Sequence, residues 1–137
     1  MITADFVKAG YAIFTVTSKT GEYYTYKVEH STGSENFAPA WFVQLLTGPD
    51  NTSDYSYLGL LDAKTGAVRL TKKSRYSDDS LPVKVIRWAL GMVWSDKPLP
   101  EGYAIEHMGL CGHCGRALTT PESLAIGIGP KCRKMGM

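Results

Sequence analysis

The feature that most constrains this chain is the placement of its three cysteines, which all fall within the last 27 residues. Cys111 and Cys114 form a C-x-x-C pair, and Cys132 follows after 17 intervening residues. Two residues between cysteines let both thiolates reach one ion, and structural zinc takes four Cys or His ligands in a closed tetrahedron. His107 stands four residues before Cys111. The spacing therefore predicts a structural zinc site formed by His107, Cys111, Cys114 and Cys132.

Other uses of these thiols fit the pattern less well. A disulfide framework needs an even number of cysteines, and a redox C-x-x-C normally belongs to a βαβ unit without a third cysteine. The identity of the fourth ligand is the open part of the prediction. The alternatives to His107 are His113 inside the C-x-x-C turn, the remote His30, a carboxylate or a water molecule.

No diagnostic pattern of catalytic residues accompanies the cysteines. Zinc deaminases pair H-x-E with P-C-x-x-C. Here Leu110 precedes Cys111, and Gly109 stands where the glutamate after His107 would be needed. The metalloprotease motif H-E-x-x-H is absent from the sequence as well. We therefore expect a structural metal and no enzymatic activity.

The segment before Cys132 predicts a short helix. Thr119 or Thr120 is the expected N-cap, because Pro121 suits the first helical position. Gly127 is expected to end the helix. The expected local core is small, so metal binding should contribute folding free energy; it comprises Leu118, Leu124, Ile126 and Ile128.

These residues resemble a small zinc-finger-like domain family of uncharacterised function that occurs in bacteriophage and plasmid proteins. The shared pattern is C-x-x-C-G-R-x-L-T-x-P-x-S followed by G-x-G-P-x-C, often with a histidine four residues before the first cysteine. The resemblance covers about residues 105–134. It implies zinc and a phage or mobile-element origin. It also implies a part in DNA transactions, because similar modules are attached to helicase-like proteins, but it gives no activity.

The residues before the cysteines predict an α+β fold. Apolar, β-branched and aromatic runs separated by turn residues predict about five strands in an antiparallel meander, at residues 11–17, 22–29, 41–46, 55–61 and 67–71. Apolar residues at helical spacing predict one helix from Pro82, capped by Ser80, to near Trp94. This helix should pack on the sheet. Residues 103–107 are a candidate last strand that leads into the metal site.

The 137 residues fit one domain with a zinc-binding appendage. We expect a sheet-and-helix domain at residues 1–95, a proline-containing linker at 96–104 and a zinc module at 105–137. There is no apolar run of 18 residues and no N-terminal signal pattern, so neither membrane insertion nor secretion is expected. With free thiols, this predicts a cytoplasmic location, in a bacterial host cell if the implied origin holds.

The net charge of +2 does not by itself indicate a nucleic-acid partner, but the basic residues are unevenly placed. Residues 111–137 carry one acidic residue and four basic ones, namely Arg116, Lys131, Arg133 and Lys134. A second basic cluster contains Lys72 and Lys73. Tyrosines on the predicted strands would give single-stranded nucleic acid faces to stack on, although tyrosine is also a common strand former.

Two classes of function remain. The first is a phage-type accessory protein that binds nucleic acid, with zinc as scaffold and the basic residues named above as contacts. The second is a phage-encoded inhibitor, a counter-defence or host-takeover effector that binds a host protein through exposed aromatic residues. The first predicts salt-dependent binding to oligonucleotides, and the second predicts a stable complex with one protein.

Overall fold

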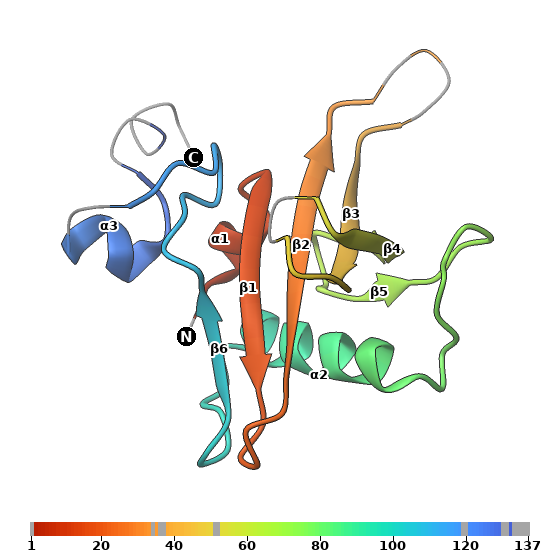
Figure 1. Cartoon of the computed structure of the whole chain (residues 1–137). Helices are drawn as coiled ribbons and strands as arrows, with labels where there is room; N and C mark the ends of the chain where they lie inside the picture. Colours follow the sequence, from red (N-terminus) through yellow and green to blue (C-terminus); the bar gives the residue numbers. More distant parts are fainter. Residues whose placement is uncertain are drawn as a thin grey trace.

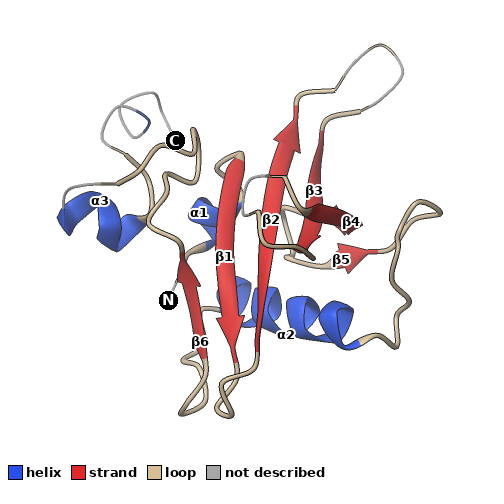
Figure 2. Cartoon of the chain, viewed as in Figure 1, coloured by secondary structure: helices blue, strands red, loops and turns tan. Residues whose placement is uncertain are grey.

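The computed structural model describes residues 2–33, 35, 38–50, 53–118, 121–129 and 132. Figure 1 shows how the elements are arranged, and Figure 2 distinguishes helices from strands. The elements in this part of the chain are α1 (Ala4–Val7), β1 (Tyr11–Thr17), β2 (Tyr23–Ser31), β3 (Ala40–Leu46), β4 (Tyr55–Leu61), β5 (Val68–Arg69), α2 (Leu81–Ser95), β6 (Ala104–His107) and α3 (Pro121–Ile126).

The strands form one curled antiparallel sheet in the order β5-β4-β3-β2-β1-β6. The predicted α+β meander with one main helix is confirmed. The sheet has six strands where about five were predicted, because the candidate last strand returns to the free side of β1. There β6 pairs with β1 in a register that sets Ile105 opposite Val16. The chain therefore enters the cysteine region from the edge of the sheet.

The alternation of residues along β2 separates the two faces of the sheet. Tyr24, Tyr26 and Val28 pack in the main core, on the face that α2 covers (Figure 1). The phenol of Tyr26 donates a 2.8 Å hydrogen bond to the carbonyl oxygen of Pro82 in α2. Since successive strand residues point to opposite faces, Thr25 and Lys27 lie on the other side. We call this other side, opposite α2, the open face.

Both ends of α2 differ in detail from a simple capped helix. Ser80 is the N-cap residue as predicted, but its hydroxyl donates to the carbonyl oxygen of Ser77 instead of accepting from the helix. Asp96 ends the helix in the left-handed conformation, with φ 55°. Within the described residues, no helix combines the length and the apolar character that crossing a bilayer requires.

The sheet extends beyond the boundary predicted at residue 95. Ile105 is fully buried in the main core, and its carbonyl oxygen accepts a hydrogen bond from the N–H of Ile2. The start of the predicted zinc module therefore belongs to the sheet. Whether residues 1–95 and 105–137 behave as separate folding units stays a prediction.

Replacing Tyr26 by Phe is expected to destabilise the protein by about 0.5–1.5 kcal/mol, the usual net contribution of one hydrogen bond. Tyr26 is fully buried, and burial raises its pKa well above the usual range, so the hydroxyl remains a donor to Pro82. Equilibrium denaturation measures the effect. The control is Tyr23→Phe, because Tyr23 is 67% exposed; an equal loss in both variants would contradict the assignment.

Candidate metal centre

The structure brings the three cysteines together at the end of β6. The sulfur atoms of Cys111, Cys114 and Cys132 all lie within 4.8 Å of one another. A tetrahedral ion with metal–sulfur bonds of about 2.3 Å, as in zinc sites, separates its sulfurs by about 3.8 Å. Cys111 and Cys132 are buried, whereas Cys114 is exposed. The cluster therefore fits a metal ion held between two buried cysteines and one exposed cysteine.

Backbone hydrogen bonds fold the chain around Cys111. Its N–H donates to the carbonyl oxygen of Arg116 at 2.7 Å, and its carbonyl oxygen accepts from Gly115 at 2.9 Å. Gly115 has a φ of 78°, which glycine adopts without the steric cost that a side chain would add. The sulfur of Cys111 also accepts from two N–H groups, those of His113 at 3.4 Å and Gly129 at 3.2 Å.

These contacts prepare Cys111 to act as a thiolate. Burial alone would raise its pKa, but the N–H groups of Gly129, Cys114 and His113, with the Cys114 thiol, outweigh burial and lower the pKa to about 7. Burial, followed by the neighbouring Cys111 and Cys114 thiols, raises the pKa of Cys132 to about 12. Three close thiols cannot all carry a negative charge without a cation between them, so a metal ion would displace protons as it binds.

The cysteine region is docked against the N-terminal part of the chain. The N–H of Tyr11 donates to the carbonyl oxygen of Gly112 at 2.6 Å, and Ala9 packs with the buried cysteines in a small second core. Phe6 joins this region to the main core. A side chain at Gly127 would begin only 2.5 Å from the Phe6 ring, and one at Gly112 only 2.7 Å from it.

The nitrogens of His107 contact backbone groups, and His107 is not part of the cysteine group. Nδ1 accepts a hydrogen bond from the N–H of Gly109 at 2.9 Å, so Nε2 donates to the carbonyl oxygen of Leu124. His107 also lies against Phe6, with 5.6 Å between ring centroids. The ligand group found among the described residues contains only the three cysteines. The assignment of His107 as fourth ligand stays a prediction, and it requires the imidazole to release one backbone contact.

The two alternative histidines have other contacts. Nδ1 of His113 donates to the carbonyl oxygen of Ala9 at 2.8 Å, which ties the C-x-x-C turn to the chain before β1. His30 stacks on Trp41 with 4.2 Å between ring centroids. Both rings are therefore engaged in packing in this structure.

The local core of this region is smaller than the sequence predicts. Leu118 and Ile128 pack with the cysteines as expected, but Leu124 and Ile126 of α3 are about 40% exposed. Ala9 and Phe6 provide the missing apolar surface. Sequence reasoning missed this because nothing local to residues 105–134 signals contact with a segment about a hundred positions earlier. Pro121 begins α3 as predicted, and Thr119 and Thr120 lie outside the described residues.

The predicted basic contact residues do not form one surface in the described part of the chain. Arg116 is exposed in the turn after Cys114, on the side of the sheet edged by β6. Lys72 and Lys73 are exposed just after β5, at the opposite edge. Lys131, Arg133 and Lys134 lie outside the described residues. Arg116 and the Lys72/Lys73 pair therefore follow strands at opposite edges of the sheet, β6 and β5 (Figure 1 shows the two strands).

Comparison with known proteins gives one partial match. Residues 104–135 match the model of a family of unknown function (DUF6011), a segment that begins with β6 and includes all three cysteines. This segment is less than a quarter of the chain. No curated protein and no solved structure matches the chain, so no enzyme family or catalytic relative is found. The segment of this chain that contains the candidate metal cluster thus resembles a domain of unknown function.

Proposed function

We propose that the cysteine cluster holds one structural Zn²⁺, with His107 as the fourth ligand. Three thiolates suit zinc better than the hard cations magnesium and calcium, which prefer oxygen ligands. When bound, zinc would supply the coordination energy that fixes Cys132 beside Ala9. The reduced thiols that this site needs favour a cytoplasmic location.

We further propose that the protein is a small accessory module, of phage type, that binds nucleic acid. This proposal rests on one observation: several exposed basic side chains form no ion pair within the described residues. Among the described residues, ion pairs involve Lys8, Lys27 and Arg87, and none involves Arg116, Lys72 or Lys73. Exposed cations held at the edges of a rigid sheet are suited to contact phosphates.

A host protein is the second candidate partner. Tyr23, Leu81 and Trp88 are exposed by 67%, 54% and 36%, respectively. Leu81 and Trp88 also border a hollow of about 220 Å³ beside α2. Aromatic side chains of this kind commonly dominate protein interfaces, so this surface favours the inhibitor hypothesis if oligonucleotides do not bind.

The purified protein is expected to bind short oligonucleotides at low salt and to lose affinity as salt increases. Fluorescence anisotropy with labelled single- and double-stranded oligonucleotides measures this. On a duplex, Arg116→Gln should reduce the slope of log affinity against log salt concentration by about one. It should weaken binding to all sequences alike. Lys84→Gln, at an exposed position of α2, is the charge-matched control. Absence of binding at low salt would eliminate the nucleic-acid proposal and direct the search to a host protein.

A further inference from the structure

Two adjoining hollows lie along the outer strands of the sheet. The first is lined by residues that include Phe42, Leu60 and Arg69, and the second by residues that include Tyr57 and Arg75. Phe42 and Tyr57 touch edge to face, with 6.1 Å between ring centroids. The two hollows therefore approach each other at this aromatic pair.

The register of the strands places these aromatic residues on the open face. Lys27 lies opposite Gln44, which lies opposite Tyr57. Two residues earlier in β3, on the other side of the register shift between Val43 and Gln44, Phe42 lies opposite Leu60, which lies opposite Arg69. Residues opposite one another in a sheet share a face. Phe42, Tyr57 and Arg69 thus lie together on the side that α2 does not cover.

Each hollow contains one exposed arginine side chain. Arg69 and Arg75 are exposed, and neither belongs to an ion pair within the described residues. Each hollow also contains one carboxylate, which keeps its negative charge and accepts a backbone hydrogen bond: Asp62 accepts from the N–H of Lys64, and Asp54 accepts from the N–H of Asp50. Both hollows can therefore offer a guanidinium to an anion.

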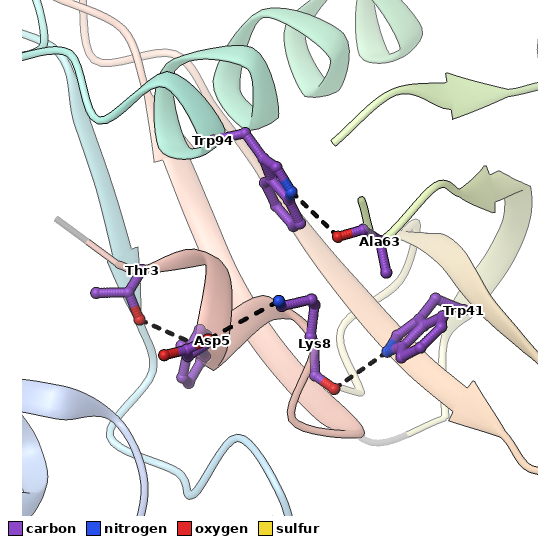
Figure 3. Close-up of polar contacts among 7 residues, drawn as sticks. Thr3, Asp5, Lys8, Trp41, Ala63 and Trp94 are labelled. Atoms are coloured by element: carbon purple, nitrogen blue, oxygen red, sulfur yellow. Dashed lines mark hydrogen bonds and ion pairs between the residues drawn. The ribbon is translucent and has the colours of Figure 1, made fainter. Parts of the chain in front are cut away.

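The walls of the first hollow are fixed by two tryptophans. Nε1 of Trp41 donates to the carbonyl oxygen of Lys8, and Nε1 of Trp94 donates to that of Ala63 (Figure 3). Lys8, Trp41 and Ala63 all line this hollow. Its lining comes from both faces of the sheet, because Trp41, Leu61 and Val68 pack in the main core, whereas Phe42, Leu60 and Arg69 lie on the open face. Its volume of about 1250 Å³ exceeds the roughly 300–1,000 Å³ of typical small-molecule sites. A pre-formed, open hollow of this size suits an extended polymer.

Charges on the neighbouring strand limit the path of such a polymer. Lys27 is nearly buried, lies over the rings of Tyr11 and Tyr55 and pairs with Glu29 at 3.8 Å, so it is not available to a phosphate. Glu29 is exposed on the open face beside Phe42 and would repel one. The anion-compatible strip is therefore confined to β3, β4, β5 and the segment that carries Arg75.

We propose that this strip binds single-stranded nucleic acid, with successive bases against Phe42 and Tyr57 and phosphates at Arg69 and Arg75. Aromatic faces beside cations bind unpaired bases, whereas the bases of a duplex are stacked on one another and not accessible. The inference rests on the proposed nucleic-acid function. It goes further by naming the class of nucleic acid and by placing the main contact on the sheet instead of the cysteine region.

The test is fluorescence anisotropy with a labelled single strand, its duplex and an abasic strand of equal length. The single strand should bind more tightly than either of the others. Phe42→Leu and Tyr57→Leu should each weaken single-strand binding about tenfold, within the range measured for loss of one stacked base. Arg69→Gln and Arg75→Gln should each reduce the salt slope by about 0.7, the value for one phosphate contact on a single strand.

Three controls separate binding from folding. Tyr57→Phe keeps the ring and removes only the hydroxyl that contacts Thr71, so it should bind as the original protein does. Lys84→Gln removes a charge on the covered side of the sheet and should leave the single-strand affinity unchanged. The two arginine variants alter exposed side chains that form no ion pair with any residue that the structure describes, so their unfolding midpoints should not change.

The possible results distinguish failure of the single-strand assignment from failure of the proposed nucleic-acid function. Equal affinity for the duplex or the abasic strand would overturn the base-stacking assignment. Full binding by all four strip variants, with loss in Arg116→Gln, would place the contact at the cysteine region and overturn the inference while the nucleic-acid function stands. Absence of binding to any oligonucleotide would overturn both.

Discussion

A preparation made with zinc present is expected to contain one zinc ion per chain, and Cys114→Ser is expected to lose most of it. Cys114 is exposed and packs in neither core, so its thiol contributes mainly through the metal. Structural zinc in zinc-finger peptides has an apparent binding free energy of about 10–16 kcal/mol, most of which becomes folding free energy. Elemental analysis measures the stoichiometry, and near-UV circular dichroism measures the packing of the aromatic side chains, which include Tyr11 and Phe6 beside the cysteine region.

Chelation should loosen the region after β6 while the sheet and α2 remain folded. The main core contains no cysteine and comprises apolar residues from β1 to β6 and α2. Far-UV circular dichroism should therefore change little when zinc is removed. Ala125→Ser is the control for Cys114→Ser, because it introduces a serine at an exposed position of α3 and leaves all three thiols in place. Substoichiometric zinc in the original protein, or collapse of the whole fold on chelation, would contradict this account.

His107→Gln tests the fourth ligand in the same experiment. If His107 binds the metal, as predicted, this variant should lose zinc at a lower chelator concentration than the original protein. If water fills the fourth position, the zinc affinity should remain, because His107 then contacts only the backbone of Gly109 and Leu124 and the ring of Phe6. Retained affinity would overturn the assignment of His107.

The fold could be predicted from the sequence to the extent that local patterns determined it. Glycine-containing turns between β-rich runs gave the antiparallel meander, and Pro82 with its apolar neighbours gave α2 within one residue at each end. The pairing partner of β6 could not be predicted. A four-residue strand has the same local pattern whether it extends the sheet or leads away from it. In the structure, pairing with β1 buries Ile105, and this burial favours extending the sheet.

The candidate site was predictable where the spacing of the cysteines along the sequence limits their geometry. The C-x-x-C pair and Cys132 could be grouped because metal sites require several soft ligands close together, and the structure does place their sulfurs together. The support beneath them was not predictable. Ala9 and Phe6 carry no chemical signature, and they meet the cysteine region only because α1 and β6 lie beside β1.

Replacing Phe6 by Ala is expected to cost about 3–5 kcal/mol of folding free energy, the range for truncating a buried aromatic side chain. Phe6 is 1% exposed and belongs to the main core. A short helix holds it there. The hydroxyl oxygen of the N-cap residue Thr3 accepts a 3.2 Å hydrogen bond from the N–H of Phe6 (Figure 3). Denaturant unfolding measures the loss, with Tyr23→Ala as the exposed aromatic control, for which the change should stay within about 0.5 kcal/mol.

The same substitution should also weaken zinc binding, although Phe6 is not a ligand. Its ring fills the space left by Gly112 and Gly127, and these two glycines are hydrogen-bonded to each other at 2.7 Å across the base of the cysteine region. Without the ring, the segments that carry Cys111 and Cys132 lose the surface that aligns them. Competition with a chromogenic chelator should show a lower zinc affinity for Phe6→Ala and an unchanged affinity for Tyr23→Ala. A destabilised Phe6→Ala protein with full zinc affinity would show that the cysteine region holds its metal independently of the sheet.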